Sequence, residues 1–172
     1  QAPGSGNCAA FSDGYVWLGH ESGLMVFDTD PITSTHIVKN HILQAPVKGL
    51  AISGNTLLIA TDGDGLHLWD ITNNEAPVVK GRFVISGSEA GRRYIGVKVL
   101  GNYAYLLNNN NQVVIVNISI PTNPIYVDTV SSANMTRFDI DTARAILRRA
   151  EDYYIRVAHD IGYSRYEDFW TW

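Results

Sequence analysis

The residues best suited to chemistry are two carboxylates, Asp62 and Asp64, in the run TDGDG. Acidic residues spaced in this way open a calcium-binding loop, because Ca²⁺ takes oxygen ligands. The loop also needs a bidentate glutamate near its end, and Asn73 stands at that position. Asp-Gly is equally the preferred chemistry of a tight hairpin turn. The sequence therefore predicts a turn, with Asp62 and Asp64 as incomplete metal candidates, and it predicts no cofactor.

Histidine and cysteine are the next candidates for a base, a ligand or a nucleophile. The five histidines show neither H-x-H nor H-x-x-x-H spacing; His20 falls in a predicted turn and His67 in a predicted strand. Cys8 has no second cysteine to pair with, so it is either a reduced thiol or a link to another chain. The sequence carries none of the motifs G-x-S-x-G, C-x-x-C and C-x-x-C-H. We therefore predict that the chain is not an enzyme.

A binding surface is predicted near the C-terminus, where aromatic and arginine side chains gather. These two residue types dominate the energetics of protein interfaces. The candidates are Arg148, Arg149, Tyr163, Tyr166, Phe169, Trp170 and Trp172. Packing of the same aromatics within the chain is the alternative.

The composition of the 172 residues is that of a folded globular protein, with 45% hydrophobic and 17% charged residues. A net charge of -4 disfavours a nucleic-acid partner, which would select a basic surface. No apolar run reaches the roughly 18 residues of a transmembrane helix. The low charge content, the Asn117-Ile-Ser and Asn134-Met-Thr triplets, and a start at Gln1 predict an extracellular, cell-surface or periplasmic protein; an excised segment would begin in the same way.

The elements that must position these residues come from a repeat. Similar units of four short strands are separated by Gly, Asn and Asp turns, and a polar residue closes each third strand, at Asp28, Asp70 and Asn117. A period of roughly 40–50 residues with four strands per unit is typical of β-propeller blades. A β-sandwich is the alternative, although it does not require the same turn chemistry to recur in register.

The pattern predicts an all-β chain in three parts. Residues 1–7 form a flexible N-terminus. Residues 8–133 form three propeller-like repeats, 8–45, 46–85 and 94–133, with an outer strand THIVK in the first and an insertion at 86–93. Residues 134–172 form an amphipathic helix, about 142–160, and an aromatic tail. A degenerate fourth blade is the alternative for this last part.

The two clearest units, SGNTLLIATDGDGLHLWDITNNEAPVV and LGNYAYLLNNNNQVVIVNISIPTNPIYV, closely resemble the LVIVD repeat family. SDGYVWLGHESGLMVFDTDP is a shorter copy, so the resemblance covers residues 8 to about 130. It implies the β-propeller scaffold of surface and secreted proteins of bacteria and archaea. It implies no particular activity, because the family is defined by its scaffold.

Three blades are fewer than the four or more that close a propeller. The expected function is therefore that of a non-enzymatic, exported repeat protein, a structural or protein-interaction module in a larger assembly. Its expected partners are other protein chains, of the same or another kind, that complete or cover the open propeller. The alternative function is a small-ligand, metal or catalytic site in the central channel.

Overall fold

The structure is a computed structural model that describes residues 6–87 and 92–131. Over these residues it consists of β-strands and one short 3₁₀-helix, η1 (Ile32–Ser34). The strands are β1 (Gly6–Ser12), β2 (Tyr15–His20), β3 (Gly23–Asp28), β4 (His36–Ile42), β5 (Val47–Ser53), β6 (Thr56–Thr61), β7 (Gly65–Asp70), β8 (Val78–Phe83), β9 (Tyr94–Leu100), β10 (Tyr103–Asn108), β11 (Gln112–Asn117) and β12 (Ile125–Ser131).

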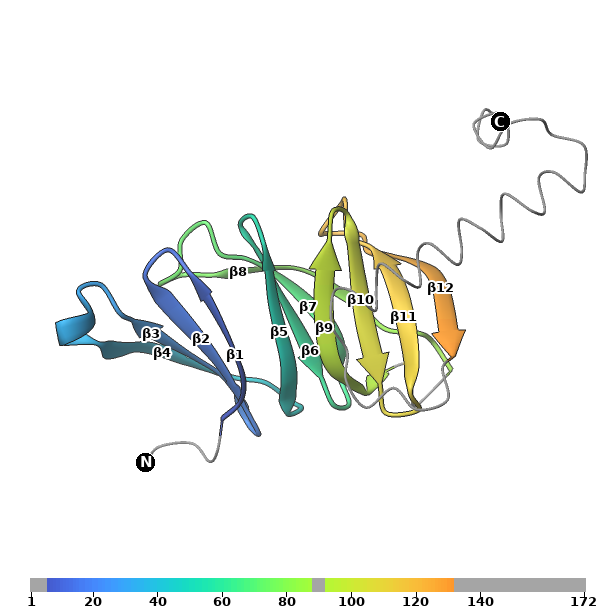
Figure 1. Ribbon diagram of the computed structural model, residues 1–172, viewed down its shortest axis with the longest axis horizontal. Coiled ribbons are helices and arrows are strands. Elements are labelled where there is room, and N and C mark those ends of the chain that lie inside the picture. The colour runs from blue at the N-terminus through green and yellow to red at the C-terminus, as the bar shows by residue number, and fades with distance from the viewer. Residues whose placement is uncertain (1–5, 88–91, 132–172) are drawn as a thin grey trace, which may run out of the picture. The chain divides into compact units, whose positions relative to one another are not determined.

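The strands form three separate four-stranded antiparallel sheets, β1–β4, β5–β8 and β9–β12, which we call the first, second and third sheet (Figure 1). Within each sheet, strands that follow one another in the chain are hydrogen-bonded neighbours. The prediction of three propeller-like repeats is confirmed, and a two-sheet sandwich is excluded for this part of the chain. The predicted outer strand THIVK is β4, which begins at His36 and continues to Ile42.

The hairpins form where the sequence places residues that tolerate a positive φ. Asp13 and Gly14 join β1 to β2 with φ values of 48° and 79°. Gly54 and Gly101 take φ values of 53° and 56° between the first two strands of the second and third sheets. Such turns match the twist of the strands they join, so each unit begins with a tight hairpin.

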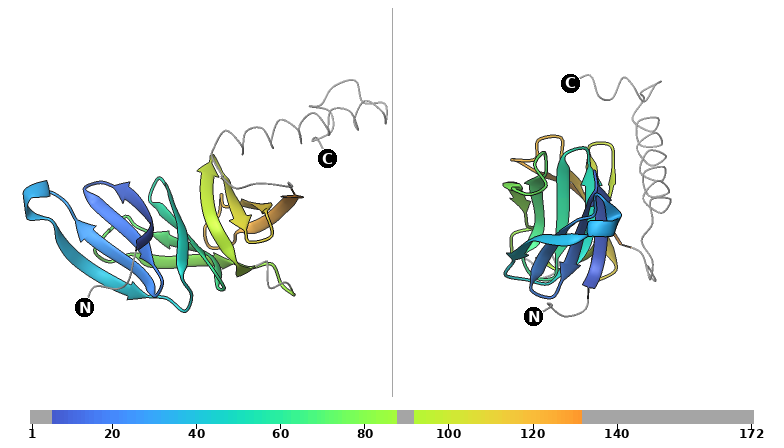
Figure 2. Two further views of the ribbon diagram at one scale, coloured as in Figure 1. Left: turned by 60° about the horizontal axis from the view of Figure 1, so that its bottom comes forward. Right: turned by 90° about the vertical axis from the view of Figure 1, so that its left-hand side faces the viewer.

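Two hydrophobic clusters hold the sheets together. The first lies between the first and second sheets and is built on Trp17, Leu24, Val26, Val47, Leu57, Ile59, Trp69 and Ile71. The second lies between the second and third sheets and includes Leu58, Ala60, Leu66, Leu68, Ala104, Leu106, Val114 and Val116. Successive residues of β6 therefore enter different clusters, because side chains alternate between the faces of a strand. Figure 2 shows the three sheets from two further directions.

The predicted C-terminal helix, 142–160, and the aromatic tail lie outside the described residues. Asn134 and residues 88–91, half of the predicted insertion at 86–93, lie outside them as well. Within 6–87 and 92–131, no helix has the length and apolar character needed to cross a membrane.

Candidate functional site

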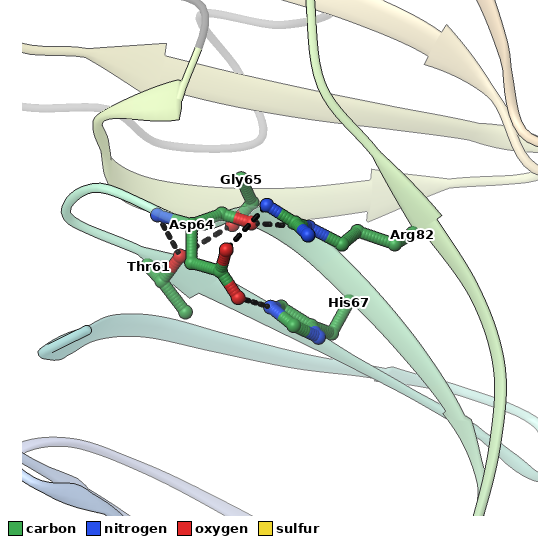
Figure 3. A network of polar contacts seen from close by, with 5 residues as sticks. All are labelled: Thr61, Asp64, Gly65, His67 and Arg82. Atoms are coloured by element: carbon green, nitrogen blue, oxygen red, sulfur yellow. Dashed lines mark hydrogen bonds and ion pairs between the residues drawn. The ribbon is translucent and has the colours of Figure 1, made fainter. Parts of the chain in front are cut away.

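Asp64, one of the two carboxylates that could hold a metal, lies in the turn between β6 and β7 and holds it closed (Figure 3). Thr61 Oγ1 accepts the backbone N–H of Asp64 at 3.1 Å and donates to the carbonyl oxygen of Gly65 at 2.8 Å. The Asp64 carboxylate binds His67 Nε2 at 2.9 Å and Arg82 Nη2. Arg82 Nε also donates to the carbonyl oxygen of Asp64 at 2.8 Å. Both carboxylate oxygens of Asp64 thus have partners within the second sheet.

The second carboxylate, Asp62, connects the second sheet to the segment that leads into the third. Arg93 Nε donates to Asp62 Oδ1 at 2.7 Å, and the two residues also form an isolated backbone bridge. This arginine, by its hydrogen bond, holds the pKa of the Asp62 carboxyl below its usual range. A cation at this turn would have to displace the arginines. Over the described residues no three His, Cys, Asp or Glu side chains are grouped as metal ligands.

His67 is a half-buried member of the network around Asp64. Burial lowers the pKa of its imidazole, and the nearby Asp64 carboxylate acts in the opposite direction. Asp64 fixes the Nε2 side of the ring, so the side chain is oriented by a partner within its own hairpin. The structure therefore places His67 in a turn network and not beside His20, the other histidine considered as a ligand.

His20 belongs to a set of repeat-equivalent residues that the sequence patterns did not reveal. The register aligns it with Thr61 and Asn108, since each ends the second strand of its sheet. These three are at most 2% exposed and are the buried polar residues of the described chain. Each closes the next turn with its side chain: His20 Nδ1 accepts the N–H of Ser22 at 3.2 Å, and Asn108 Oδ1 accepts the N–H of Gln112 at 3.0 Å.

The tautomer of His20 follows from its partners. Because Nδ1 accepts a backbone N–H, the ring proton lies on Nε2, which donates to Asn40 Oδ1 at 3.2 Å. Both ring nitrogens are therefore used inside the first sheet. His20 has the geometry of a turn cap, which is the role that a threonine and an asparagine fill in the other two sheets.

A second repeated device sits where each third strand ends. The side-chain oxygens of Asp28, Asp70 and Asn117 accept the backbone N–H two residues further on, each at 2.9 Å. These Asx turns explain why the polar residue recurs in the sequence, since they direct the chain out of the sheet. The hydroxyl and backbone N–H of Thr72, with Lys80, lower the pKa of Asp70 to about 2.

Cys8 is a half-buried residue of β1 that lies next to the first cluster. Burial raises the pKa of its thiol to about 11. A thiol in this state is a poor nucleophile at neutral pH, because the thiolate is the reactive form. The environment of Cys8 is thus that of a small packed side chain.

One apolar surface stands out on the first sheet. Phe11, Val16, Phe27 and Ile37 lie directly opposite one another across β1, β2, β3 and β4, and we call them the open row. Phe11 is 66% exposed and Ile37 56% exposed, while Val16 and Phe27 are half-buried. None of the four belongs to either cluster. A row of large apolar side chains in water is a typical feature of an interaction surface.

In the other two sheets the first three positions of this row are covered, while the fourth, Val79 in the second sheet and Tyr126 in the third, is 61% and 48% exposed. In the second sheet the first three positions of the row are Ile52, Leu57 and Trp69, which pack in the first cluster. In the third sheet its first three members pack in the second cluster: Val99, Ala104 and Val116. Over its first three strands, the first sheet thus presents the face that the second and third sheets each bury against the sheet before them, and no sheet precedes the first among the described residues.

The opposite face of the third sheet differs from the open row. Tyr105, Leu107, Val113 and Ile115 share this face and are at most 7% exposed. Burial raises the pKa of Tyr105 to about 12. Tyr103 and Ile125 share this face at one end of the strands and are 38% and 53% exposed, so both outer faces expose some large apolar side chains.

The candidates chosen for an interface from the sequence all follow Ser131. They lie outside the described residues: Arg148, Arg149, Tyr163, Tyr166, Phe169, Trp170 and Trp172. Their interface role stays a prediction. The open row is not evident from the sequence, because pairing across four strands is needed to bring its members together.

Comparison with solved structures places the described sheets among β-propellers. The computationally designed Ika8 protein matches with a TM-score of 0.56 and 14% identity, over 75% of this chain and 37% of that one. The Cps50 (Swd1) β-propeller domain of Myceliophteria thermophila matches with a TM-score of 0.53 and 17% identity, over 80% of this chain and 42% of that one. The chain thus corresponds to less than half the length of either structure.

A third solved structure is PorZ of Porphyromonas gingivalis, described as an essential bacterial surface component of the type-IX secretion system. It matches with a TM-score of 0.51 and 19% identity, over 74% of this chain and 16% of that one. At these identities the likeness concerns the fold. No curated protein sequence matches the chain.

The sequence itself matches a repeat family. The LVIVD repeat is recognised at residues 46–84 and 91–132, which correspond to the second and third sheets. The first sheet has the same strand order, turn caps and exit turns. Residues 46–84 and 91–132 are therefore LVIVD repeats of propeller-like fold, and the first sheet shares their architecture.

Proposed function

We propose that this chain is a structural or protein-interaction module, not an enzyme, and that it binds another protein chain through the open row. The observation that carries the proposal is the 66% exposure of Phe11, at a row position where the other two sheets hold Ile52 and Val99, which pack against the clusters. Burying such a row removes apolar surface from water, which stabilises the bound form by about 25 cal/mol per Å² of apolar surface buried. Repeated sheets of this kind bury their faces against neighbouring sheets, so we expect a partner protein to bury the exposed face of the first sheet.

We also propose that the protein acts outside the cytoplasm, in the extracellular space, at the cell surface or in the periplasm. The support is the low charge content and the two Asn-x-Ser/Thr triplets. Asn117, in one triplet, is a partly exposed residue at a strand exit. Fractionation of cells that produce the complete natural protein tests this location, and recovery only in the cytoplasm would contradict it.

The open row is tested by Phe11→Ser. Because Phe11 supplies the most exposed side chain of the row, we expect its loss to weaken association of the full chain at least tenfold. Ile32→Ser is the matched control, since Ile32 is 82% exposed but lies on η1. Size-exclusion chromatography with light scattering over a concentration series measures the mass.

The expected mass of the wild-type chain rises above 19.0 kDa with concentration. The Phe11→Ser mass should stay near this value at concentrations where the Ile32→Ser mass rises. A compact wild-type monomer at every concentration would refute self-association. Equal behaviour of the two variants would show that association uses another surface.

A further inference from the structure

His41 lies on β4, where the first sheet meets the second. Its ring stacks edge-on against Trp69 of β7, with ring centroids 5.1 Å apart and planes at 74°. Trp69 is 5% exposed and belongs to the first cluster. The contact therefore joins the outer strand of one sheet to the interior of the next.

The register shows that a histidine here replaces an apolar residue. His41 pairs with Leu24 of β3, as Phe83 pairs with Leu66 in the second sheet and Val130 with Val113 in the third. Phe83 is 7% exposed and packs in the second cluster, between the second and third sheets. The equivalent place between the first and second sheets holds the ionisable side chain of His41.

The surroundings of His41 favour the neutral ring. Its Nε2 is buried and finds no hydrogen-bond partner among the described residues, so in the imidazolium, whose ring nitrogens both donate, the Nε2–H would have no acceptor. Burial first, and the positive charge of Lys39 second, lower the pKa of the His41 imidazole.

Few charged groups lie on the strands around His41. The ionisable residues of the five strands β3 to β7 are Asp28, His36, Lys39, Lys48, His67 and Asp70. Of these, Lys39 is the one whose charge acts on His41. No carboxylate of these strands acts on the ring to stabilise an imidazolium.

We propose that the contact between the first and second sheets is an acid-sensitive joint, loosened when His41 takes up a proton. At the equivalent place between the second and third sheets stands Phe83, which carries no titratable group. Acidification should therefore act on one contact between sheets and leave the other in place. Protonation of His41 would thus weaken the contact that joins the first sheet, which carries the open row, to the second sheet.

The sign follows from proton linkage. The pKa of His41 in the folded chain lies below the ordinary value near 6.5, so the opened form binds the proton more tightly. The contact between the sheets has its full stability above the ordinary histidine pKa. It loses stability as the pH falls from that value towards the lowered pKa of His41. Within that interval the opening equilibrium rises up to about tenfold per pH unit.

Hydrogen exchange of the full chain at about pH 7.5 and about pH 5 tests the joint, with rates corrected for the intrinsic pH dependence of amide exchange. In the wild type we expect the protection of β2 and β3 to fall up to about tenfold per pH unit below 6.5. Protection of β10 and β11 should change much less, which gives an internal reference in the same molecule.

His41→Phe is the informative variant, because Phe83 fills the same place in the second sheet. It should abolish the selective acid response, and His41→Val, which copies Val130 of the third sheet, should do the same if the phenylalanine does not fit. His36→Phe, at the start of β4, should keep the wild-type response. The proposal is overturned if acidification lowers the exchange protection of β2–β3 and of β10–β11 equally, or if both His41 variants keep the wild-type acid response. It is also overturned if the protection of β2 and β3 rises on acidification, as it would if Trp69 stabilised the imidazolium.

Discussion

Gly49→Ala is expected to lower the free energy of unfolding by about 1–3 kcal/mol, the usual cost of overpacking an interior. A β-carbon at Gly49, on β5, would lie 2.9 Å from Gly96 Cα and 2.9 Å from the backbone nitrogen of Val97, on β9. Both are backbone atoms, so no rotamer change relieves the clash. The second and third sheets would have to move apart along their first strands.

Gly96→Ala is the matched control for this prediction. Gly96 stands at the same place in its sheet, but a β-carbon there would meet only Leu107 Cβ, at 3.9 Å, among the described atoms. The change should be neutral, or stabilising by about 0.4–1 kcal/mol through the unfolded chain. Urea denaturation of both variants measures the difference. Equal stabilities would show that β5 and β9 do not approach as closely as described.

His20→Ala is expected to destabilise the fold by about 1–3 kcal/mol, the penalty for leaving buried polar groups without partners. The change removes the acceptor of the Ser22 N–H and the donor to Asn40, at a site that is 1% exposed. The expected loss of folding stability therefore comes from the turn between β2 and β3. It should appear as a lower urea midpoint, with an unchanged dependence of the free energy of unfolding on urea concentration.

His20→Asn separates a turn cap from a ligand or base. Asn108 caps the equivalent turn of the third sheet, so asparagine at position 20 should recover at least half of the stability lost with alanine. His36→Ala, at an exposed histidine, should stay within about 0.5 kcal/mol of the wild type. If asparagine were as damaging as alanine, the imidazole itself would be required and the capping role would be wrong.

The sequence predicted the scaffold because its determinants are local. Polar residues at the three strand exits recur since each accepts a backbone N–H two positions on. Asp13-Gly14 and the glycines at positions 54 and 101 mark hairpins since they adopt positive φ at little cost. These signals lie within a few residues of the structure they specify, and the strands they delimit are confirmed.

The site features escaped prediction because they depend on pairing between strands. Histidine, threonine and asparagine share no chemical type, so the common place of His20, Thr61 and Asn108 appears only in the register. The ion pair between Asp62 and Arg93 crosses from one sheet towards the next, at a distance in sequence that no local pattern covers. The open row likewise takes one residue from each of four strands.

The most direct test of the central claim is hydroxyl-radical labelling of Phe11 and Ile32 in the full chain, at a dilute and a concentrated condition. Phe11 is 66% exposed within the open row, and Ile32 is 82% exposed outside it. Labelling of Phe11 should fall severalfold as the measured mass rises, while labelling of Ile32 stays constant. A rising mass with Phe11 still fully labelled would contradict the assignment of the open row as the binding surface.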